Sequence, residues 1–416
     1  MNDSQSNHYV GLDIGTSKVR CVIGIDNPEN PLQPSVIGYG EAVNIGIRKG
    51  VISHIDDVAD SVIAAINEAE QISGIKIQNA TININGSSVV GLNSEGVIAI
   101  NSPNREITYD DVIRVEEAAT ILQLPSNKEI VQVFAKNYRL DGQENIKDPL
   151  GMQGIRLEVE SHIITASTPS LKNLYTTMEK ANIGINHLTV SGLAGAEAVL
   201  NRQQKESGTL LLDIGASTTN LSVIEDGEIQ HVAVIPVGGM NITNDLAIGL
   251  RVDLDLAEQV KLKHANLKKD RQQAWESEVK FQGELFTFST TEIQMIVEAR
   301  LEELLEFVEE ELNNINKAKK LPGGVVLVGG TSKLPGIDAL TRDKLQLPAR
   351  LGKVEKLHGI VDTVKDPSYS TAVGLMVLDM LLGDASSFDK HSDKNGLNLT
   401  SISNKVLNKF KRLKNK

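Results

Sequence analysis

The stretch Leu12-Asp13-Ile14-Gly15-Thr16-Ser17 is echoed two hundred positions later by Leu212-Asp213-Ile214-Gly215-Ala216-Ser217. Each copy has the pattern of an apolar strand that ends in aspartate, a turn of small and hydroxyl-bearing residues, and a second apolar strand, at residues 19–25 or 221–224. Glycine lets the backbone approach a ligand closely, N–H groups and hydroxyls of the turn can face phosphate oxygens, and the aspartate can reach Mg²⁺ through water. A single Asp-x-Gly turn is common, but two copies at the starts of two halves favour a shared phosphate site.

A third glycine-rich element follows later in the chain. Residues 325–328 form a run typical of a buried strand, Gly329-Gly330-Thr331-Ser332 has the composition of a turn, and residues 335–337 can open a helix. A strand, a glycine turn and a helix in this order suit the sugar and base of a nucleotide. The chain has neither a Walker A loop nor a Gly-x-Gly-x-x-Gly fingerprint, so the P-loop and Rossmann classes are excluded.

Composition limits the class of protein further. The 416 residues predict two or more domains, and the shares of 40% apolar and 23% charged residues are those of a globular chain. The single cysteine, Cys21, indicates a reduced, intracellular chain, and residues 1–8 lack the basic and apolar segments of an export signal. No run of about 20 apolar residues is available to span a bilayer. The net charge of −12 and the 3% of aromatic residues argue against nucleic acid as a partner.

Positive charge is concentrated at the C-terminus. The last seventeen residues carry six positive charges and no negative one, which leaves −18 on the remainder. Residues 384–398 have the polar composition of a flexible linker. At about 100° per residue, residues 399–416 separate apolar from basic side chains, which predicts an amphipathic helix that binds an anionic membrane surface. The residues assigned to membrane contact are Leu399, Ile402, Val406, Leu407, Lys409, Phe410, Arg412 and Leu413. The alternative is a basic extension that aids solubility or binds nucleic acid.

Local patterns predict several helices. Apolar residues at helical spacing indicate a helix at 56–73 that ends at Gly74, and residues 108–111 have a threonine and an aspartate spaced to cap another helix. Small residues at 192–198 and 372–374 predict two helices that can approach closely. From residue size alone, such a pair is consistent with ordinary tight packing.

The two Asp-Ile-Gly turns and the late Gly-Gly turn resemble those of the superfamily of actin, Hsp70 and sugar kinases. Within it, the chain is most similar to the FtsA family of actin-like bacterial cell division proteins. The motifs that carry this likeness are Ile235-Pro236-Val237-Gly238-Gly239 with Thr243-Asn244-Asp245, Asp148-Pro149-Leu150-Gly151-Met152 with Arg156-Leu157-Glu158-Val159, and Gly50-Val51-Ile52. The likeness extends over most of residues 9–383.

The resemblance implies an α/β, actin-like ATPase fold with two duplicated lobes, an inserted subdomain and a C-terminal amphipathic helix. The expected division of the chain is 1–84, 165–195 and 362–383 for the first lobe (1A), 85–164 for the inserted subdomain (1C), 196–250 and 306–361 for the second lobe (2A), 251–305 for subdomain 2B, 384–398 for the linker, and 399–416 for the membrane-targeting helix.

The resemblance also implies ATP and Mg²⁺ as ligands in a cleft between the lobes. The residues that match the family's nucleotide contacts are Asp13, Gly15, Thr16, Ser17 and Lys18 in the first turn, Asp213, Gly215, Ser217 and Thr218 in the second, Gly239 after it, Glu258 and Lys261 near the ribose and adenine, and Gly329, Gly330 and Thr331 opposite. Asp13 and Asp213 are expected to hold Mg²⁺ through water. From spacing alone, Glu258 and Lys261 could equally belong to an exposed helix face.

The sequence departs from the family pattern at two places. Ala216 and Ser217 stand where a glycine pair is common, and Asn220 stands where an acidic residue is common. If position 216 needs a left-handed backbone, an alanine there costs roughly 1–2 kcal/mol. We therefore expect a binding protein with at most slow ATP hydrolysis rather than an enzyme, and no catalytic residue can be named. The sequence shows no serine-histidine-acid trio, zinc-ligand spacing or HExxH motif.

The function that the resemblance implies is that of an ATP-binding, polymerising adaptor, peripheral on the cytoplasmic face of the membrane at the division site. Such an adaptor tethers the ring of the tubulin-like protein FtsZ by binding the FtsZ C-terminal peptide near residues 251–305. It also self-associates into filaments and helps to recruit other division proteins. Two alternatives remain open: a PilM-like platform protein of type IV pilus assembly, whose phosphate turn resembles residues 213–221, and a sugar kinase of the same fold.

Overall fold

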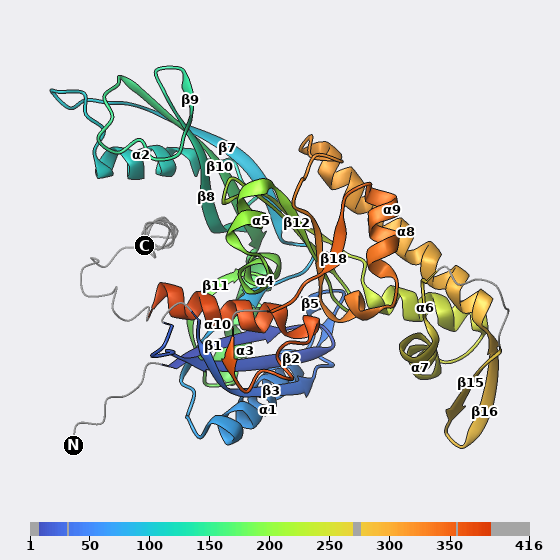
Figure 1. Ribbon diagram of the computed structural model, residues 1–416. Coiled ribbons are helices and arrows are strands. Elements are labelled where there is room, and N and C mark those ends of the chain that lie inside the picture. The colour runs from blue at the N-terminus through green and yellow to red at the C-terminus, as the bar shows by residue number, and fades with distance from the viewer. Residues whose placement is uncertain (1–7, 31–32, 269–275, 355–356, 384–416) are drawn as a thin grey trace.

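The computed structural model describes residues 8–30, 33–268, 276–354 and 357–383, which form two main β-sheets (Figure 1). We call each sheet, with the helices that cover it, a lobe. The sheet of the first lobe has the strand order β11-β6-β1-β2-β3-β19. Its strands are β1 (His8–Ile14), β2 (Lys18–Ile25), β3 (Ser35–Val43), β6 (Asn79–Ile84), β11 (Gly184–Val190) and β19 (His358–Gly359).

The sheet of the second lobe repeats this arrangement in the order β14-β13-β12-β17-β18. Its strands are β12 (Thr209–Ile214), β13 (Thr219–Glu225), β14 (Glu228–Ile235), β17 (Gly324–Val328) and β18 (Ala349–Leu351). In both lobes, the strand whose next-to-last residue is aspartate pairs antiparallel with the next strand and parallel with a later one. The antiparallel registers are also equivalent, because Asp13 lies opposite Arg20 and Asp213 lies opposite Asn220. The sequence echo is therefore a duplication of structure.

Two helices of small residues join the lobes. Helix α4 (Ser191–Val199) packs on β12 and β13, helix α10 (Ser370–Leu382) packs on β1 and β2, and the two helices cross. A Cβ atom on Gly374 would lie 1.7 Å from the carbonyl oxygen of Ala194, and one on Gly11 would lie 2.1 Å from that of Ala372. No side chain larger than hydrogen fits at these two positions, so the predicted close approach of the two helices is confirmed.

The outer face of the first lobe is covered by α1 (Ile55–Ser73), which packs on β2 and β3, and by α3 (Thr168–Lys180). Helix α1 buries one apolar face and ends at Gly74, whose φ of 72° and N–H bond to the Glu70 carbonyl form a left-handed cap. The helix predicted at 56–73 is therefore confirmed. The short strands β4 (Ile47–Arg48) and β5 (Val51–Ile52) precede α1, and α5 (Arg202–Ser207) precedes the second sheet.

A separate four-stranded sheet interrupts the first lobe after β6 and projects away from the body (Figure 1). Its order is β7-β10-β8-β9, from β7 (Val90–Ala99), β8 (Lys128–Leu140), β9 (Gln143–Ile146) and β10 (Arg156–Ser167). Helix α2 (Tyr109–Ala119) covers one face and buries a core of its own with Ile107, Val115 and Leu157. Thr108 and Asp111 form the predicted capping box at the start of α2. We call residues 86–165 the insert.

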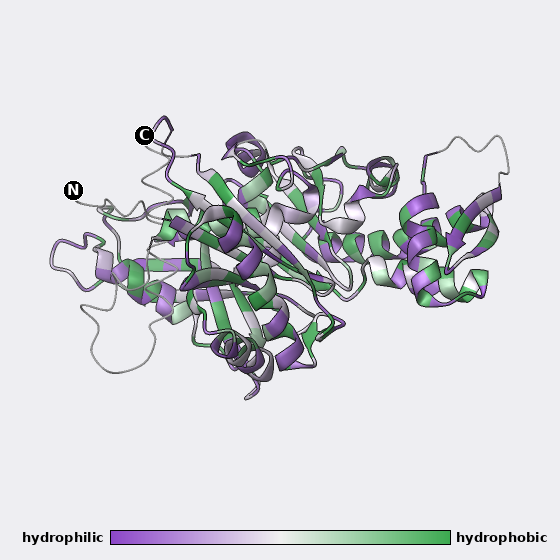
Figure 2. Ribbon diagram, turned by 90° about the horizontal axis from the view of Figure 1, so that it is seen from below, coloured by the Kyte–Doolittle hydropathy of each residue, from purple (hydrophilic) through white to green (hydrophobic). Residues whose placement is uncertain are grey.

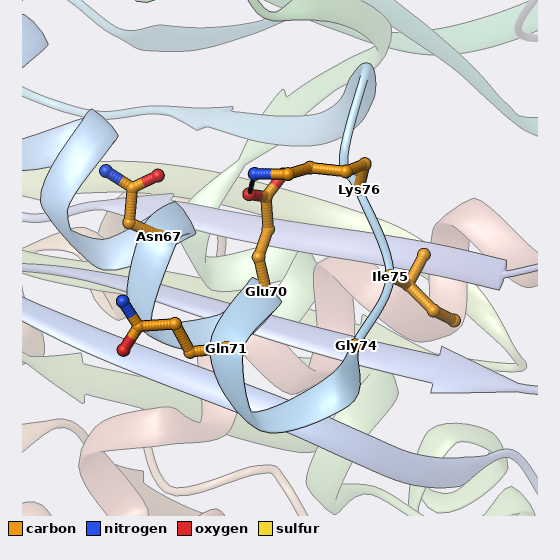
Figure 3. Close-up of a pocket in the computed structure, with 6 residues that line it drawn as sticks. All are labelled: Asn67, Glu70, Gln71, Gly74, Ile75 and Lys76. Carbon is orange, nitrogen blue, oxygen red and sulfur yellow. Dashed lines mark hydrogen bonds and ion pairs between the residues drawn. The ribbon is translucent and has the colours of Figure 1, made fainter.

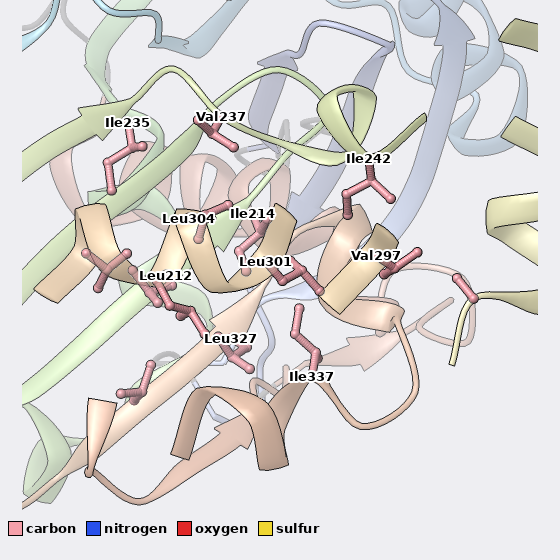
Figure 4. Close-up of a cluster of buried hydrophobic side chains, with 14 of the residues drawn as sticks. Leu212, Ile214, Ile235, Val237, Ile242, Val297, Leu301, Leu304, Leu327 and Ile337 are labelled. Atoms are coloured by element: carbon pink, nitrogen blue, oxygen red, sulfur yellow. The ribbon is translucent and has the colours of Figure 1, made fainter. Parts of the chain in front are cut away.

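The second lobe has a helical layer and a small hairpin at the opposite end from the insert (Figures 1 and 2). Its helices are α6 (Gly239–Leu250), α7 (Leu254–His264), α8 (Thr290–Asn314), the 3-10 turns η1 (Gly330–Lys333) and η2 (Pro367–Tyr369), and α9 (Ile337–Leu345); the hairpin is β15 (Glu276–Phe281) and β16 (Glu284–Ser289). Figure 4 shows Val297, Leu301 and Leu304 of α8 facing Leu212 and Ile214 of β12. This buried cluster fixes the position of the strand that leads into the second turn.

Candidate functional site

The two predicted turns have the same internal hydrogen bonding. The N–H group of Gly15 donates to the Lys18 carbonyl at 3.1 Å, and that of Gly215 donates to the Thr218 carbonyl at 2.9 Å. In each turn, the preceding aspartate is buried at the end of its strand. The duplicated sequence therefore builds the same reversal twice, once in each sheet.

The two turns are related through their buried aspartates. Burial raises the pKa of Asp13 to about 7, the charge of Asp213 adds to that increase, and Arg20 and a hydrogen bond from Asn83 oppose it. Burial also raises the pKa of Asp213, against a hydrogen bond from Thr371 and the charge of Arg20. The two carboxyl groups are thus close enough to repel each other in a buried setting.

This pair of carboxyl groups fits a divalent cation. Two buried carboxylates, of which Asp213 raises the pKa of Asp13, carry negative charge that Mg²⁺ would offset, and oxygen atoms are the ligands that Mg²⁺ prefers. Over the ranges that the structure describes, no cluster of three or more His, Cys, Asp or Glu side chains is arranged to hold a metal ion. Asp13 and Asp213 are the residues that would hold a divalent cation at this place.

The glycine turn at 329–332 is bonded directly to the turn that follows Asp213. The hydroxyl of Thr331 donates to the Gly215 carbonyl at 2.9 Å. Gly329 has a φ of 87°, and a Cβ atom there would lie 2.4 Å from Asp213 Oδ1, so glycine is required on both grounds. Gly330 is exposed, and no atom lies within 4 Å of where its Cβ would be, so it borders open space.

Glu258 and Lys261 do not form an exposed helix face. Lys261 is buried, and its ammonium group donates to the Gly239 carbonyl at 3.0 Å and to the Thr243 hydroxyl at 2.8 Å. It also pairs with Glu258 Oε2 at 2.6 Å. The N–H group of Gly239 in turn donates to the Gly215 carbonyl at 2.9 Å. Helix α7 is thereby tied to the second turn through the start of α6.

Three of the remaining predicted side chains, those of Lys18, Ser217 and Thr218, have partners within the protein. Thr218 Oγ1 accepts from Asn85 at 3.1 Å, and Ser217 Oγ lies 3.4 Å from Met240 Sδ. Lys18 forms an ion pair with Glu41 on β3, on the outer side of its own hairpin. An ion pair to the neighbouring strand β3 thus holds the ammonium group of Lys18.

Sequence reasoning missed several residues that hold the first turn. Asn83 is buried, donates to Asp13 Oδ1 at 2.7 Å and to Ser191 Oγ at 2.8 Å, and accepts from the N–H of Ile14. Asn44 donates through Nδ2 to the Gly15 carbonyl at 2.8 Å. The only sequence signal for Asn83 was a polar residue within an apolar strand, since its partners are set by parallel pairing.

The two departures from the family pattern have structural explanations. Ala216 is not among the residues with positive φ in the described chain, so the backbone cost that a left-handed conformation would impose does not arise. Asn220 lies opposite Asp213, and its side chain opposes the rise in the pKa of that carboxyl group. An acidic residue at 220 would instead place a second negative charge beside Asp213.

A hollow of about 240 Å³ lies elsewhere, at the C-terminal end of α1 (Figure 3). It is lined by Asn67, Glu70, Gln71, Gly74, Ile75 and Lys76. The Glu70 carboxylate already binds Lys76 and the N–H group of Ile77. None of the predicted site residues lines this hollow, so the candidate site remains the pair of turns.

The linker predicted at 384–398 and the residues predicted to bind the membrane, from Leu399 to Leu413, lie outside the described residues. Within the part of the chain that the structure covers, no helix combines the length and the apolar character needed to cross a bilayer.

Comparison with known families identifies two matching segments. A family model described as "Cell division protein FtsA" matches residues 210–374, and one described as "SHS2 domain inserted in FTSA" matches residues 86–165. Curated relatives named "Cell division protein FtsA" include those of Pseudomonas aeruginosa, 35% identical over 88% of each chain, and of Bacillus subtilis, 38% identical over 88% of this chain and 82% of the relative. The Borreliella burgdorferi relative is 35% identical over 97% of this chain and 96% of its own.

Solved structures show the same fold at lower identity. A PilM–PilN type IV pilus biogenesis complex matches with a TM-score of 0.63 and 18% identity over 89% of this chain and 97% of that one. MreB5 of Spiroplasma citri bound to ADP matches with a TM-score of 0.54 and 14% identity over 90% of this chain and 96% of that one. The expected α/β, actin-like fold with an inserted subdomain is therefore confirmed.

The buried position of Asp13 predicts a measurable stability change. Because its pKa is about 7 in the folded chain and near 4 when unfolded, the folded form binds more protons between these values. The contribution of Asp13 to the free energy of unfolding is therefore fully present below pH 4 and is lost as the pH rises to 7. Asp13→Asn removes that loss, so without nucleotide we expect it to stabilise the chain by about 4 kcal/mol at pH 7.5 and by about 1 kcal/mol at pH 4.5.

Urea unfolding of the wild type and Asp13→Asn from pH 4.5 to 8 measures this difference. The control is Asp60→Asn, which removes an exposed carboxylate from α1. A stability difference between Asp13→Asn and the wild type that does not grow with pH would contradict the raised pKa of Asp13.

Proposed function

The chain belongs to the FtsA family of cell division proteins, and from that premise we propose that it is an ATP-binding, polymerising, actin-like adaptor. In this role it tethers the FtsZ ring to the inner face of the cytoplasmic membrane and helps to recruit other division proteins. The observation that supports the proposal is the pair of equivalent turns, each with a buried aspartate, the second of which is bonded to Thr331 and Gly239.

The nucleotide part of the proposal assigns the triphosphate to the space between the turns. Asp13 and Asp213 would hold Mg²⁺ through water, and the turns at 15–18 and 215–218 would contact the phosphates. Residues Glu258 and Lys261 would lie near the ribose and adenine, with the turn 329–331 opposite. A bound Mg²⁺ would supply charge neutralisation for the phosphates and both carboxylates. The MreB5 structures bound to ADP and AMPPNP support a nucleotide in this fold.

We propose a binding protein with at most slow hydrolysis rather than an enzyme. Relatives named as cell division proteins favour the adaptor over a sugar kinase or a pilus platform protein. The PilM–PilN match, at 18% identity, is a likeness of fold alone. ATP in the cleft would instead select a relative position of the lobes that favours self-association.

Gly330→Val tests the nucleotide site without straining the fold. Gly330 borders open space and does not have a positive φ, so a valine is tolerated there but occupies the space assigned to the nucleotide. By calorimetry we expect the wild type to bind MgATP and Gly330→Val to bind at least tenfold more weakly, with an unchanged Tm. The control is Ala64→Val on the exposed face of α1. Undetectable MgATP binding by the wild type would sink the proposal, and equal affinities of the wild type and Gly330→Val would refute this placement.

We propose that the FtsZ C-terminal peptide binds to residues 251–305. Three elements of this segment carry exposed apolar side chains, namely Leu262 on α7 (73% exposed), Leu285 on β16 (63%) and Met295 on α8 (67%). Apolar side chains that stay this exposed are suited to a partner's apolar residues. The hairpin β15–β16 and α7 stand at one end of the molecule, where a peptide has access (Figure 2).

Introducing a negative charge tests the peptide site. We expect Leu262→Asp and Met295→Asp each to weaken binding of a fluorescent FtsZ C-terminal peptide at least tenfold in an anisotropy titration, because each buries a charge against the peptide. Ile121→Asp is the control, since Ile121 is 85% exposed but lies in the insert. Weakening by Ile121→Asp to the same degree would move the peptide site away from 251–305.

We propose that residues 399–416 bind the anionic membrane surface as an amphipathic helix. Six basic residues contribute up to about 1 kcal/mol each near anionic lipid, and the apolar arc adds burial below the headgroups. One such helix binds reversibly, but several on one filament bind together through their effective concentration. Self-association would thereby strengthen the attachment to the membrane.

Deletion of 399–416 should abolish co-sedimentation with vesicles of phosphatidylglycerol and phosphatidylethanolamine while MgATP binding is retained. A matched pair separates the apolar arc from charge: Leu407→Asp should reduce sedimentation strongly, whereas Asn408→Asp, with the same added charge on the polar face, should reduce it slightly. Equal sedimentation of the truncated and full chains would refute the membrane assignment.

A further inference from the structure

A buried histidine joins the insert to the second lobe. His162 lies on β10 with no exposed surface, and its Nε2 accepts the N–H group of Val232 on β14 at 3.1 Å. Its Nδ1 lies 2.7 Å from Asn93 Oδ1 on β7. Because a backbone N–H can only donate, Nε2 is unprotonated and Nδ1 carries the hydrogen that Asn93 accepts. Burial, followed by the charges of His231 and Lys136, lowers the pKa of His162 to about 3, so the ring stays neutral near pH 7.

The contact occupies the edge of the second lobe's sheet. Strand β14 is the last strand of that sheet, so its outward N–H groups have no neighbouring strand. His162 supplies the acceptor for one of them. The Val232 side chain is buried in the apolar cluster of the first lobe with Val89 and Ile164. Gly91 makes room for this contact, because a Cβ atom there would lie 2.4 Å from the Val232 carbonyl oxygen.

Strand β14 runs from this contact to the second phosphate turn. Val232 is three residues, or about 10 Å of extended chain, from the end of β14 at Ile235. Immediately beyond it, the Val237 carbonyl accepts from the Thr219 hydroxyl at 2.8 Å, and the N–H of Met240 donates to the Ala216 carbonyl at 2.7 Å. A shift of the turn is therefore a shift of the strand that His162 holds.

The root of the insert touches the same turn. Asn85, which immediately precedes the insert, donates to Thr218 Oγ1 at 3.1 Å. Gly86 and Gly50 meet at this point, since a Cβ atom on Gly86 would lie 2.5 Å from the Gly50 carbonyl oxygen and one on Gly50 would lie 2.8 Å from Thr218 Cγ2. The insert is thus held at two places, at its root beside the turn and at His162 along β14.

We propose that His162 is a positioning residue that transmits occupancy of the nucleotide site to the insert. The inference rests on the proposed function, since it assigns regulation to the same site. Movement of the turn about a bound nucleotide moves β14, and the buried N–H of Val232 cannot part from His162 without losing its acceptor. The insert therefore follows β14 and pivots at Gly86, which changes the surface that it offers to other proteins.

Two substitutions test the two ring nitrogens of His162 one at a time. His162→Asn keeps a donor near the Nδ1 position for Asn93 but removes the acceptor for Val232. His162→Gln places an amide oxygen near the Nε2 position and keeps that acceptor. The first should break the transmission, and the second should largely retain it, although both remove the ring.

Hydrogen exchange of the full chain measures the effect, with and without MgATP, at concentrations at which light scattering detects no assembly. In the wild type we expect MgATP to slow exchange at least threefold in β7 and β10, which contain no predicted nucleotide contact. His162→Asn should bind MgATP within threefold of the wild type but lose this change, and His162→Gln should keep it. Gly91→Ala, which forces the contact apart, should behave like His162→Asn and serves as a second variant if His162→Asn fails to fold.

Three outcomes overturn the proposal. MgATP binding by the wild type without a change in β7 and β10 would overturn the relay alone, and this result does not depend on any variant. The same change in His162→Asn as in the wild type would show that another contact carries it. Undetectable MgATP binding by the wild type would overturn the proposed function and the relay together.

Discussion

The structure depends on holding two buried carboxyl groups, those of Asp13 and Asp213, close together at the junction of two sheets. Burial opposes the ionisation of both groups and raises the pKa of each, and the charge of Asp213 further raises the pKa of Asp13. Asn83 and Thr371 each donate a hydrogen bond to one of the two, and the charge of Arg20 acts on both. These partners come from β6, α10 and β2. Side chains from three elements thus favour the ionised form of the two carboxyl groups. Their arrangement suits a cation and the anion that accompanies it.

The crossing of α4 and α10 sets how far apart these carboxyl groups lie. Ser191 at the start of α4 accepts from Asn83, which holds Asp13, and Thr371 at the start of α10 donates to Asp213. The same two helices touch at Gly374, where a Cβ atom would meet the Ala194 carbonyl oxygen at 1.7 Å. Each helix therefore holds one turn while it packs against the other, so a change in their crossing changes both turns together. Close packing transmits such shifts because interiors do not compress.

Sequence reasoning succeeded where the signal is local or repeated. The duplicated turns, the helix closed by Gly74 and the capping box at Thr108 each depend on a few neighbouring residues, and each is present. Asn83 could not be found in this way, since its contact with Asp13 arises from parallel pairing between β1 and β6. Lys261 was left undecided because spacing does not reveal burial, and burial here comes from α6. Ala216 raised an expectation of strain that depended on a backbone angle, which the sequence does not fix.

The distribution of charge along the chain supports the proposed membrane attachment through the C-terminal tail. Without its last seventeen residues the chain carries −18, so an anionic membrane repels the body wherever the two approach within a Debye length of about 8–10 Å. A short segment of +6, placed beyond a polar stretch of fifteen residues, is attracted to the same surface. Opposite charges in one chain therefore favour attachment through the tail with the lobes held away from the lipid. On the proposed function, this leaves the exposed apolar side chains of residues 251–305 available for a peptide partner rather than for the bilayer.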